Sequence, residues 1–282
     1  MNVTTLIEEH RDALSPAERR VADVVLRDQE LVAFGTVAAV ASKASTSGAS
    51  VVRLASRLGL DGFSALQALV QGQLSRQLRP ATERIRQPGP ADVIGRVLAA
   101  ELDNVHGTLD RVDRVAFDGA VRALAGSERS GQVFLASGDA SSGVLTQFAA
   151  ELGMLRTGVV VLDGSEVAVA RLSALAGPAD VGLVLDLRRY DRAVVASGRR
   201  LADAGVALIA LTDRALSPLS AMAGTTFVVE AQGVGPFDSY VGALALLNAL
   251  VAAVSARLRS SATTRLDRIE VTWRAADALT DD

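Results

Sequence analysis

The residues best suited to chemistry lie between Thr36 and Phe63, where the pattern predicts two short helices joined by a tight polar turn. The second helix carries a polar stripe, because Ser50, Arg53 and Arg57 recur at i, i+3 and i+7. Hydroxyl and guanidinium groups presented by a helix can hydrogen-bond to base edges and phosphates in a DNA major groove. The segment at about 37–58 therefore predicts a helix-turn-helix motif that binds double-stranded DNA.

The rest of the second helix predicts how it is held in place. Ser47 is expected to cap its first N–H groups, and Gly59 is expected to end it. The apolar positions recur at helical spacing and should face the domain core: Val51, Leu54, Ala55 and Leu58.

An amphipathic helix with arginine on its polar face is also a common solvated surface, so the DNA-binding interpretation needs a second observation. From Lys43 to Arg86, positive residues outnumber acidic residues by seven to two, although the formal net charge of the chain is -3. Such a local excess is what a phosphate-facing surface requires. We expect Ser50 and Arg53 nearest the base edges, and Lys43 and Arg57 on phosphates. The candidate DNA-binding residues are Lys43, Thr46, Ser47, Ser50, Arg53 and Arg57.

Length and composition limit the remaining function classes. A chain of 282 residues suggests two domains, and its hydrophobic fraction of 49% with only 4% aromatic residues favours helices and buried parallel strands. There is no cysteine, and the two histidines have no metal-ligand spacing, so we expect no metal, no cofactor and no thiol chemistry. No apolar run is long enough for a membrane span and no signal peptide is visible, so we expect a cytoplasmic protein.

Composition changes along the chain predict its domain organisation. Ser15 to Glu18 reads as a capping box with proline at the first helical position, so a helix should begin at Pro16. Prolines at 80, 88 and 90 mark a linker. We divide the chain into a helix-turn-helix domain at 1–78, a linker at 79–92, connecting helices at 93–128, an α/β domain at 129–260 and a C-terminal tail at 261–282.

The α/β domain is predicted from short apolar runs that alternate with helical segments. Strands without a polar face indicate a parallel sheet that is covered on both sides. The fold class is therefore α/β, with an all-helical N-terminal domain followed by a doubly wound, five-stranded parallel sheet. The candidate strands are Gln132 to Ser137, Gly158 to Leu162, Val181 to Leu187, Val206 to Leu211 and Thr225 to Val229.

Ligands of such folds bind outside the carboxyl ends of the strands, so three loops become candidates for an effector site. The loop after the first strand reads SGDASSG, and its small residues and hydroxyls suit an anion or an ordinary serine-capped turn equally well. The loop after the third strand contains adjacent arginines, which either clamp an anionic ligand or pair with Asp186 in a structural role. The candidate effector-binding residues are Gly138, Ser141, Ser142, Asp186, Arg188, Arg189, Thr212 and Ser217. No catalytic set emerges from these loops, because no nucleophile lies near a histidine base.

The chain resembles the RpiR family of bacterial transcriptional regulators from Leu14 to about Arg257. The segments that carry the resemblance are LSPAERRVADVVL, TVAAVASKASTSGASVVRLASRLGLDGF, SGDASSG and LTDRALSPL. The resemblance implies an N-terminal helix-turn-helix domain and a C-terminal sugar isomerase (SIS) domain. It also implies binding to DNA as a homodimer or homotetramer, with a phosphorylated sugar or related metabolite as effector on the SIS domain.

One loop departs from the family pattern. Where phosphosugar-binding SIS domains usually carry Ser-x-Ser-Gly-x-Thr, this chain has Asp186-Leu187-Arg188-Arg189-Tyr190-Asp191, and Ala140 replaces a glycine of the first loop. The sequence leaves three alternatives open. The domain senses a sugar acid or another anionic metabolite, it serves only for oligomerisation, or the protein is a SIS-fold sugar phosphate isomerase or lyase.

Overall fold

The computed structural model describes residues 3–78, 81–86, 92–126, 131–215 and 217–280. The chain divides into two compact units, Met1–Gly89 and Pro90–Asp282. Our finer division, with a linker at 79–92 and connecting helices at 93–128, stays a prediction. The segment that we expected to be a C-terminal tail contains most of a long helix, α14 (Arg259–Ala275).

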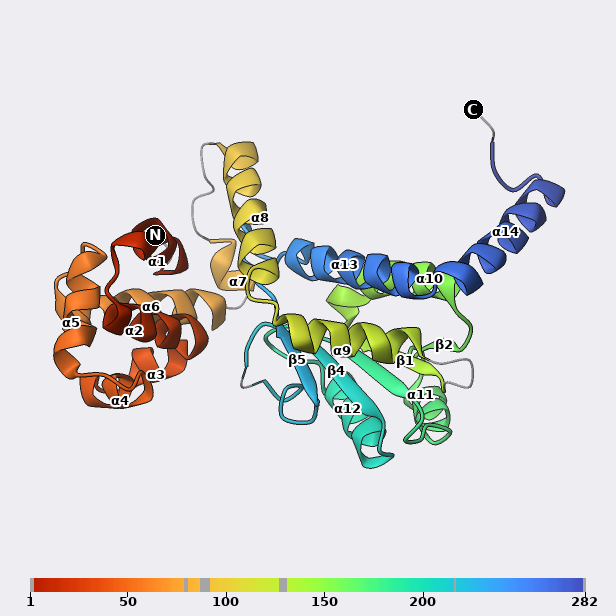
Figure 1. Ribbon diagram of the computed structural model, residues 1–282, viewed down its shortest axis with the longest axis horizontal. Coiled ribbons are helices and arrows are strands. Elements are labelled where there is room, and N and C mark those ends of the chain that lie inside the picture. Colours follow the sequence, from red (N-terminus) through yellow and green to blue (C-terminus); the bar gives the residue numbers. More distant parts are fainter. Residues whose placement is uncertain (1–2, 79–80, 87–91, 127–130, 216, 281–282) are drawn as a thin grey trace. The chain divides into compact units, whose positions relative to one another are not determined.

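The described part of the N-terminal unit is helical, as the sequence predicts. A capping box opens its second helix, where the Glu18 N–H donates to Ser15 Oγ at 3.4 Å and the Ser15 N–H donates to Glu18 Oε2 at 2.8 Å. Three short helices, Val3–His10, Gln29–Phe34 and Ala81–Arg84, were not predicted. The α-helices are α1 (Val3–His10), α2 (Pro16–Arg27), α3 (Gln29–Phe34), α4 (Val37–Lys43), α5 (Gly48–Arg57), α6 (Gly62–Leu78) and α7 (Ala81–Arg84) (Figure 1).

This unit has its own hydrophobic core. Helices α2, α4, α5 and α6 all contribute fully buried aliphatic side chains, among them Val21, Val40, Leu54 and Leu66. Gln67 on α6 donates from Nε2 to the backbone oxygens of Val32 and Gly35 at the end of α3. The helix-turn-helix therefore sits on a packed scaffold that fixes its shape.

The second unit is built on the parallel sheet that the sequence predicts. Its strands are β1 (Val133–Ser137), β2 (Val159–Val161), β3 (Val181–Leu185), β4 (Ala207–Thr212) and β5 (Thr225–Val228). Their order is β2-β1-β3-β4-β5, and every neighbouring pair is parallel. All five predicted strands are present, with ends that differ by one or two residues.

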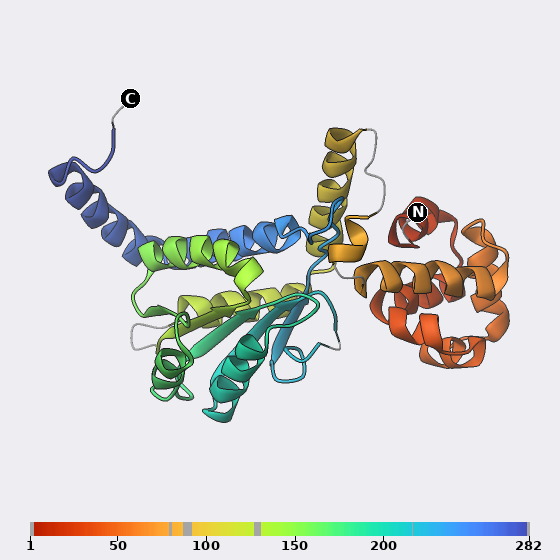
Figure 2. The ribbon, with the colours of Figure 1, turned by 180° about the vertical axis from the view of Figure 1, so that it is seen from behind.

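Helices cover both faces of the sheet, which explains its apolar strands. In β1, Val133 and Leu135 point to one face while Phe134 and Ala136 point to the other, and each set is buried in a separate core. The first core is covered by α9 (Arg114–Ala125), α10 (Ser142–Leu155) and α13 (Val241–Arg257). The second is covered by α11 (Glu166–Ser173) and α12 (Arg192–Asp203), as Figures 1 and 2 show from opposite sides.

Two further helices extend this unit. Helix α8 (Val93–Leu109) packs against α13, and α14 begins beside α10 and continues beyond it (Figure 2). Among the described residues, no single helix has the length and apolar character needed to cross a membrane. Helices α13 and α14 meet these criteria only together, with a bend of 102° between them.

Candidate functional sites

The turn between α4 and α5 is tight, as predicted. The Thr46 N–H donates to the Ala41 oxygen at 2.9 Å, and the Ser45 N–H donates to the Ser42 oxygen at 3.0 Å. Ser45 has a positive φ of 49°, the left-handed conformation that commonly follows the last turn of a helix. The turn therefore sets the angle at which α5 leaves α4.

Helix α5 ends as predicted but begins differently. Gly59 has a φ of 74°, and the Leu60 N–H donates to the Ala55 oxygen at 2.9 Å, so glycine closes the helix. Ser47 occupies the N-cap position, but its side chain accepts no backbone N–H. Its Oγ instead lies 3.2 Å from Ser50 Oγ. The prediction that Ser47 caps α5 through its hydroxyl is therefore wrong.

The prediction that Ser50 shares the exposed stripe is also wrong. Ser50 is only 2% exposed, and its Oγ accepts a hydrogen bond from Arg53 Nη2 at 2.9 Å. A helix turns by about 100° per residue, which places Ser50 at the border of the apolar face, next to the turn. Arg53 and Arg57 are exposed as expected, and so is Lys43 at the end of α4. Ser50 consequently orients Arg53 and does not present its own hydroxyl.

The exposed face of α5 also carries residues that we did not predict. Ala49, Val52 and Ser56 lie on this face, and Val52 is 42% exposed. Small and apolar side chains on a recognition helix can contact the methyl group of thymine. Their spacing of i, i+3 and i+7 was visible in the sequence, but their uncharged side chains gave no signal of their own.

A carboxylate from another helix lies close to the two arginines of α5. Glu18 on α2 is 3% exposed, and its pKa is lowered first by the hydrogen bond from the Ser15 N–H and also by the charges of Arg57 and Arg53. Helix α2 packs directly against α5. Glu18 therefore links the capping box of α2 to the electrostatics of the candidate DNA-binding face.

In the second unit, the loop after β1 is closed on itself. Ser141 is fully buried, and its Oγ donates to the Gly138 oxygen at 3.1 Å. Ser142 Oγ donates to the Asp139 oxygen at 2.7 Å. The two hydroxyls that we expected to bind an effector thus hydrogen-bond to the protein backbone in this structure.

The loop after β3 wraps around the carboxylate of Asp186. Its oxygens accept hydrogen bonds from the Leu187 N–H at 2.9 Å and the Asp191 N–H at 2.6 Å, at the head of α12. Asp186 is 7% exposed, and a Cβ on Gly138 would lie 2.6 Å from Asp186 Oδ1. Gly138 is therefore needed where the loops after β1 and β3 touch. The Asp186 carboxylate thus accepts the backbone N–H hydrogen bonds that a bound anion would otherwise accept.

The predicted pairing of the adjacent arginines with Asp186 is not observed, while the predicted clamp on an anionic ligand stays a prediction. Arg188 is buried and pairs with Asp238, which no local sequence pattern indicated, while Arg189 is exposed and has a φ of 66°. Among the described residues, Asp186 is hydrogen-bonded to backbone N–H groups and not to arginine.

The loop after β4 contributes a third set of polar groups. Tyr190 donates to Asp213 Oδ1 at 2.6 Å, and burial raises the pKa of Tyr190, with Asp213 raising it further. Thr212 is fully buried at the end of β4. Ser217 is also buried, and its Oγ accepts the Ser220 N–H at 3.0 Å, so it caps a single turn and not the helix that we expected there.

Burial favours the protonated form of Asp186. Desolvation raises the pKa of Asp186 to about 6, with smaller increases from Asp191 and Asp213, while the N–H groups of Asp191 and Leu187 oppose the shift. The folded state therefore binds this proton more tightly than the unfolded state does. The resulting stabilisation is present at low pH and is lost as the pH rises through about 6.

We expect Asp186→Asn to change the pH dependence of stability. Between about pH 4.5 and about pH 7.5, the difference in free energy of unfolding between wild type and variant should shift by about 2 kcal/mol in favour of the variant. Urea unfolding followed by intrinsic fluorescence measures this unit selectively, because Tyr190, Tyr240 and Trp273 all lie in it. Asp203→Asn, an exposed residue at the end of α12, is the control. A difference that does not vary with pH would contradict the prediction.

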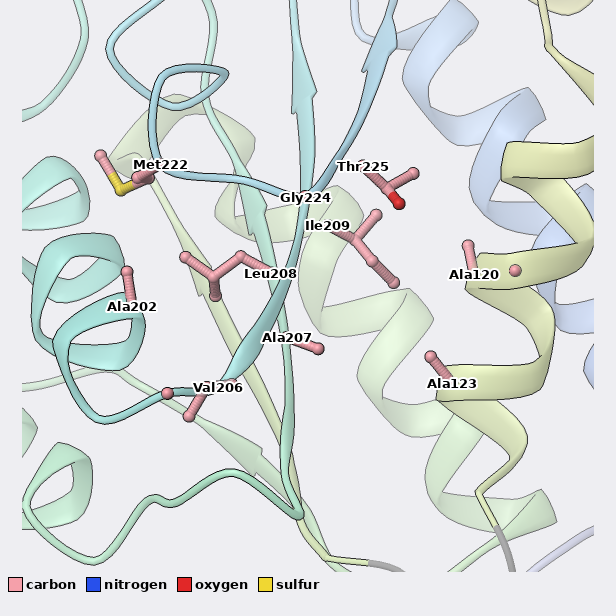
Figure 3. A pocket seen from close by; sticks show the side chains of 12 residues that line it. Ala120, Ala123, Ala202, Val206, Ala207, Leu208, Ile209, Met222, Gly224 and Thr225 are labelled. Atoms are coloured by element: carbon pink, nitrogen blue, oxygen red, sulfur yellow. The ribbon is translucent and has the colours of Figure 1, made fainter.

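The structure also contains a shallow pocket of about 570 Å³ at the opposite ends of the strands. It is lined by small and apolar residues near the first residues of β4 and β5, including Ala207 and Thr225 (Figure 3). No charged side chain lines it. Within the described residues, moreover, no group of three or more His, Asp or Glu side chains is placed to hold a metal ion.

Comparisons with known proteins agree with this architecture. Residues 1–77 match the model of the helix-turn-helix domain of the RpiR family, and residues 131–253 match the SIS domain model. The chain thus carries a helix-turn-helix domain of the RpiR family and a SIS domain. It is 29% identical over 120 residues to the uncharacterized HTH-type transcriptional regulator YbbH of Bacillus subtilis. That match covers 42% of this chain and 42% of YbbH, so it spans less than half of the relative's length.

Two solved structures share the fold of this chain. The sugar isomerase domain of an RpiR transcription factor from Sphaerobacter thermophilus is 27% identical, with a TM-score of 0.59, and the match covers 62% of this chain and 97% of that one. The NanR protein of Vibrio vulnificus, solved with ManNAc-6P, is 20% identical with a TM-score of 0.56, and the match covers 98% and 99%.

Proposed function

We propose that this protein is a sequence-specific DNA-binding transcriptional regulator that acts in the cytoplasm. The observation that carries the proposal is the exposed face of α5, where Ser50 holds Arg53 and where Arg57 lies on the same side. A helix that follows a tight turn and presents an oriented guanidinium group is suited to the major groove. YbbH is named as a transcriptional regulator, which supports the same function.

We further propose that the SIS unit senses a sugar-derived or other anionic metabolite. Arg188 is a cation buried at the carboxyl ends of the strands, where ligands of doubly wound folds bind. NanR was solved with a sugar phosphate, which supports a sugar-related effector. The Asp186 carboxylate already accepts hydrogen bonds from the backbone N–H groups that a phosphate would use, which favours a ligand other than a phosphate.

An enzymatic function remains the second candidate, because SIS domains also occur in sugar isomerases. A positioned acid–base pair would be needed for isomerisation. In the described loops after β3 and β4, the carboxylates of Asp186, Asp191 and Asp213 already accept hydrogen bonds from backbone N–H groups, Tyr190 or arginine. We therefore propose the regulator and not the enzyme.

Fluorescence anisotropy tests this function. The purified protein is titrated onto DNA from immediately upstream of its own gene and onto a scrambled duplex, each at two salt concentrations. Preference for the upstream DNA should persist at higher salt, because base contacts do not depend on counterion release. Equal, salt-sensitive binding to both duplexes would contradict sequence-specific binding, and turnover of a sugar phosphate would favour the enzyme.

We also propose that the protein is a homo-oligomer that uses the first half of α8 as a contact surface. Four large apolar side chains of this segment are exposed, with Ile94 at 84% and Leu98 at 60%. Exposed apolar patches of this kind commonly mark interfaces, and helix-turn-helix proteins commonly read two half-sites as dimers.

Sedimentation velocity should detect a dimer or tetramer of the wild-type protein. Ile94→Glu combined with Leu98→Glu should shift it toward the monomer, because two charges would be buried in the interface. Val167→Glu, which alters an exposed valine on α11, is the matched control. A monomeric wild type, or an unchanged assembly in the double variant, would contradict the proposal.

A further inference from the structure

Arg188 is a buried cation that the fold leaves incompletely bound. Its side chain is 7% exposed, and its Nη2 donates to Asp238 Oδ1. Its Nε is buried and has no hydrogen-bond partner among the described residues. A guanidinium group binds a carboxylate best through two parallel hydrogen bonds. Arg188 therefore holds a carboxylate now and has an unused donor for a ligand.

The surroundings of Arg188 restrict the charge of such a ligand. Asp186 and Asp213 lie close enough, together with Asp238, to raise the pKa of Tyr240 beyond the effect of burial, to about 12. Asp186 also accepts hydrogen bonds from the N–H groups of Leu187 and of Asp191, which precedes α12. A doubly charged phosphate would add negative charge to this acidic surrounding. A single carboxylate that replaces Asp238 on Arg188 would leave the local charge unchanged.

Asp238 belongs to a segment, residues 230–239, that is fastened to α8. Asn104 accepts the Gln232 N–H at 2.9 Å and donates to the Gln232 oxygen at 3.0 Å. Thr108 Oγ1 accepts the Glu230 N–H at 2.9 Å. Asn104 and Thr108 are each 1% exposed, so these hydrogen bonds are shielded from water.

The far end of the segment is fastened to the same helix. Ser239, next to Asp238 in the chain, donates from Oγ to Glu101 Oε2 at 2.6 Å, and Glu101 also accepts from Asn104 Nδ2 at 2.9 Å. The Ser239 N–H donates to the Ala231 oxygen at 3.1 Å, which closes the segment into a loop. Ser239 and Glu101 therefore connect Asp238 to α8, the first described helix of this unit.

We propose that Asp238 is an internal competitor for the effector, that a carboxylate ligand displaces it from Arg188, and that the 230–239 segment passes this exchange to α8. The inference rests on the proposed effector role of the SIS unit. It assigns the ligand class, a monocarboxylate such as a sugar acid, and it assigns the contact that ligand binding breaks.

Isothermal titration calorimetry of the full-length protein without DNA tests whether a carboxylate ligand competes with Asp238 for Arg188. The probes are sodium acetate, sodium D-gluconate and sodium phosphate at matched ionic strength. Asp238→Asn should bind at least one carboxylate about tenfold more tightly than the wild type does, because the charged competitor is gone. Arg188→Gln should abolish that binding. Asp203→Asn, which neutralises an exposed carboxylate elsewhere, should behave like the wild type.

Three results would overturn the proposal. They are equal or weaker carboxylate binding by a folded Asp238→Asn variant, carboxylate binding that survives Arg188→Gln, and tighter binding of phosphate than of either carboxylate. Because these titrations contain no DNA, their failure is distinguishable from failure of DNA recognition, which the anisotropy experiment decides separately.

Hydrogen exchange of the wild-type protein tests the transmission step without any variant. At a saturating concentration of the carboxylate that it binds, the amides of Glu230 and Gln232 should exchange faster, because the segment loosens from α8. Amides of α8 around Asn104 should change with them. Changes confined to the loop 186–191, or no change on carboxylate addition, would overturn transmission through the segment.

Discussion

Replacing Arg53 with alanine is expected to weaken binding to the specific DNA site by about 1 to 3 kcal/mol and to relax the preference at one base pair. Arg53 is exposed on α5, and its Nη2 is held by Ser50 Oγ at 2.9 Å. An arginine oriented in this way pays less conformational entropy when it binds the two acceptors of a guanine. Anisotropy titrations with single base-pair substitutions in the bound site measure the effect.

Arg57→Ala is the matched control for that experiment. Arg57 lies one turn further along the same face, and we expect it to contact phosphates. Its removal should weaken all duplexes similarly and reduce the slope of log K against log salt concentration by about one. If both variants retain wild-type affinity for every duplex, α5 is not the recognition helix.

Gly242→Ala is expected to destabilise the second unit by about 3 kcal/mol, which would be the largest stability effect of the proposed variants. Gly242 is buried in the first turn of α13, where this helix crosses α8. A Cβ there would lie 2.5 Å from Thr108 Oγ1, 2.7 Å from the Glu230 oxygen and 3.0 Å from the Asn104 oxygen. Two of these atoms are backbone atoms, so the helices would have to separate.

Urea unfolding followed by the fluorescence of Tyr190, Tyr240 and Trp273 measures this loss. Gly153→Ala is the control, because Gly153 lies within α10 and a Cβ there would meet nothing within 4 Å. That variant should be neutral or more stable by about 0.5 to 1 kcal/mol, as expected for glycine to alanine within a helix. Equal stabilities of the two variants would show that the α8–α13 crossing tolerates a methyl group.

Local sequence signals predicted the architecture well, because they depend on neighbours along the chain. The capping box at Ser15 and Glu18, the glycine ending of α5 at Gly59 and the five apolar strands each rest on a short stretch of sequence. Their agreement with the structure reflects the direct link between residue type and backbone geometry at helix ends and in buried strands.

The candidate sites were less predictable, because their partners are distant in sequence. Arg188 pairs with Asp238, fifty residues away, and Asn104 bonds to Gln232, which is 128 residues away. No spacing rule connects such residues. Ser50 illustrates a second limit, since a residue at the border of a helical face is buried or exposed according to the adjoining turn. Periodicity alone assigned it to the wrong side.

The lengths of the strands have a consequence for solubility at high local concentration. The two outer strands, β2 and β5, contain three and four residues, whereas the inner strands contain five or six. A short outer strand offers few unpaired backbone groups to a strand from another molecule. The short outer strands thereby discourage two copies of this protein from joining their sheets edge to edge into aggregates.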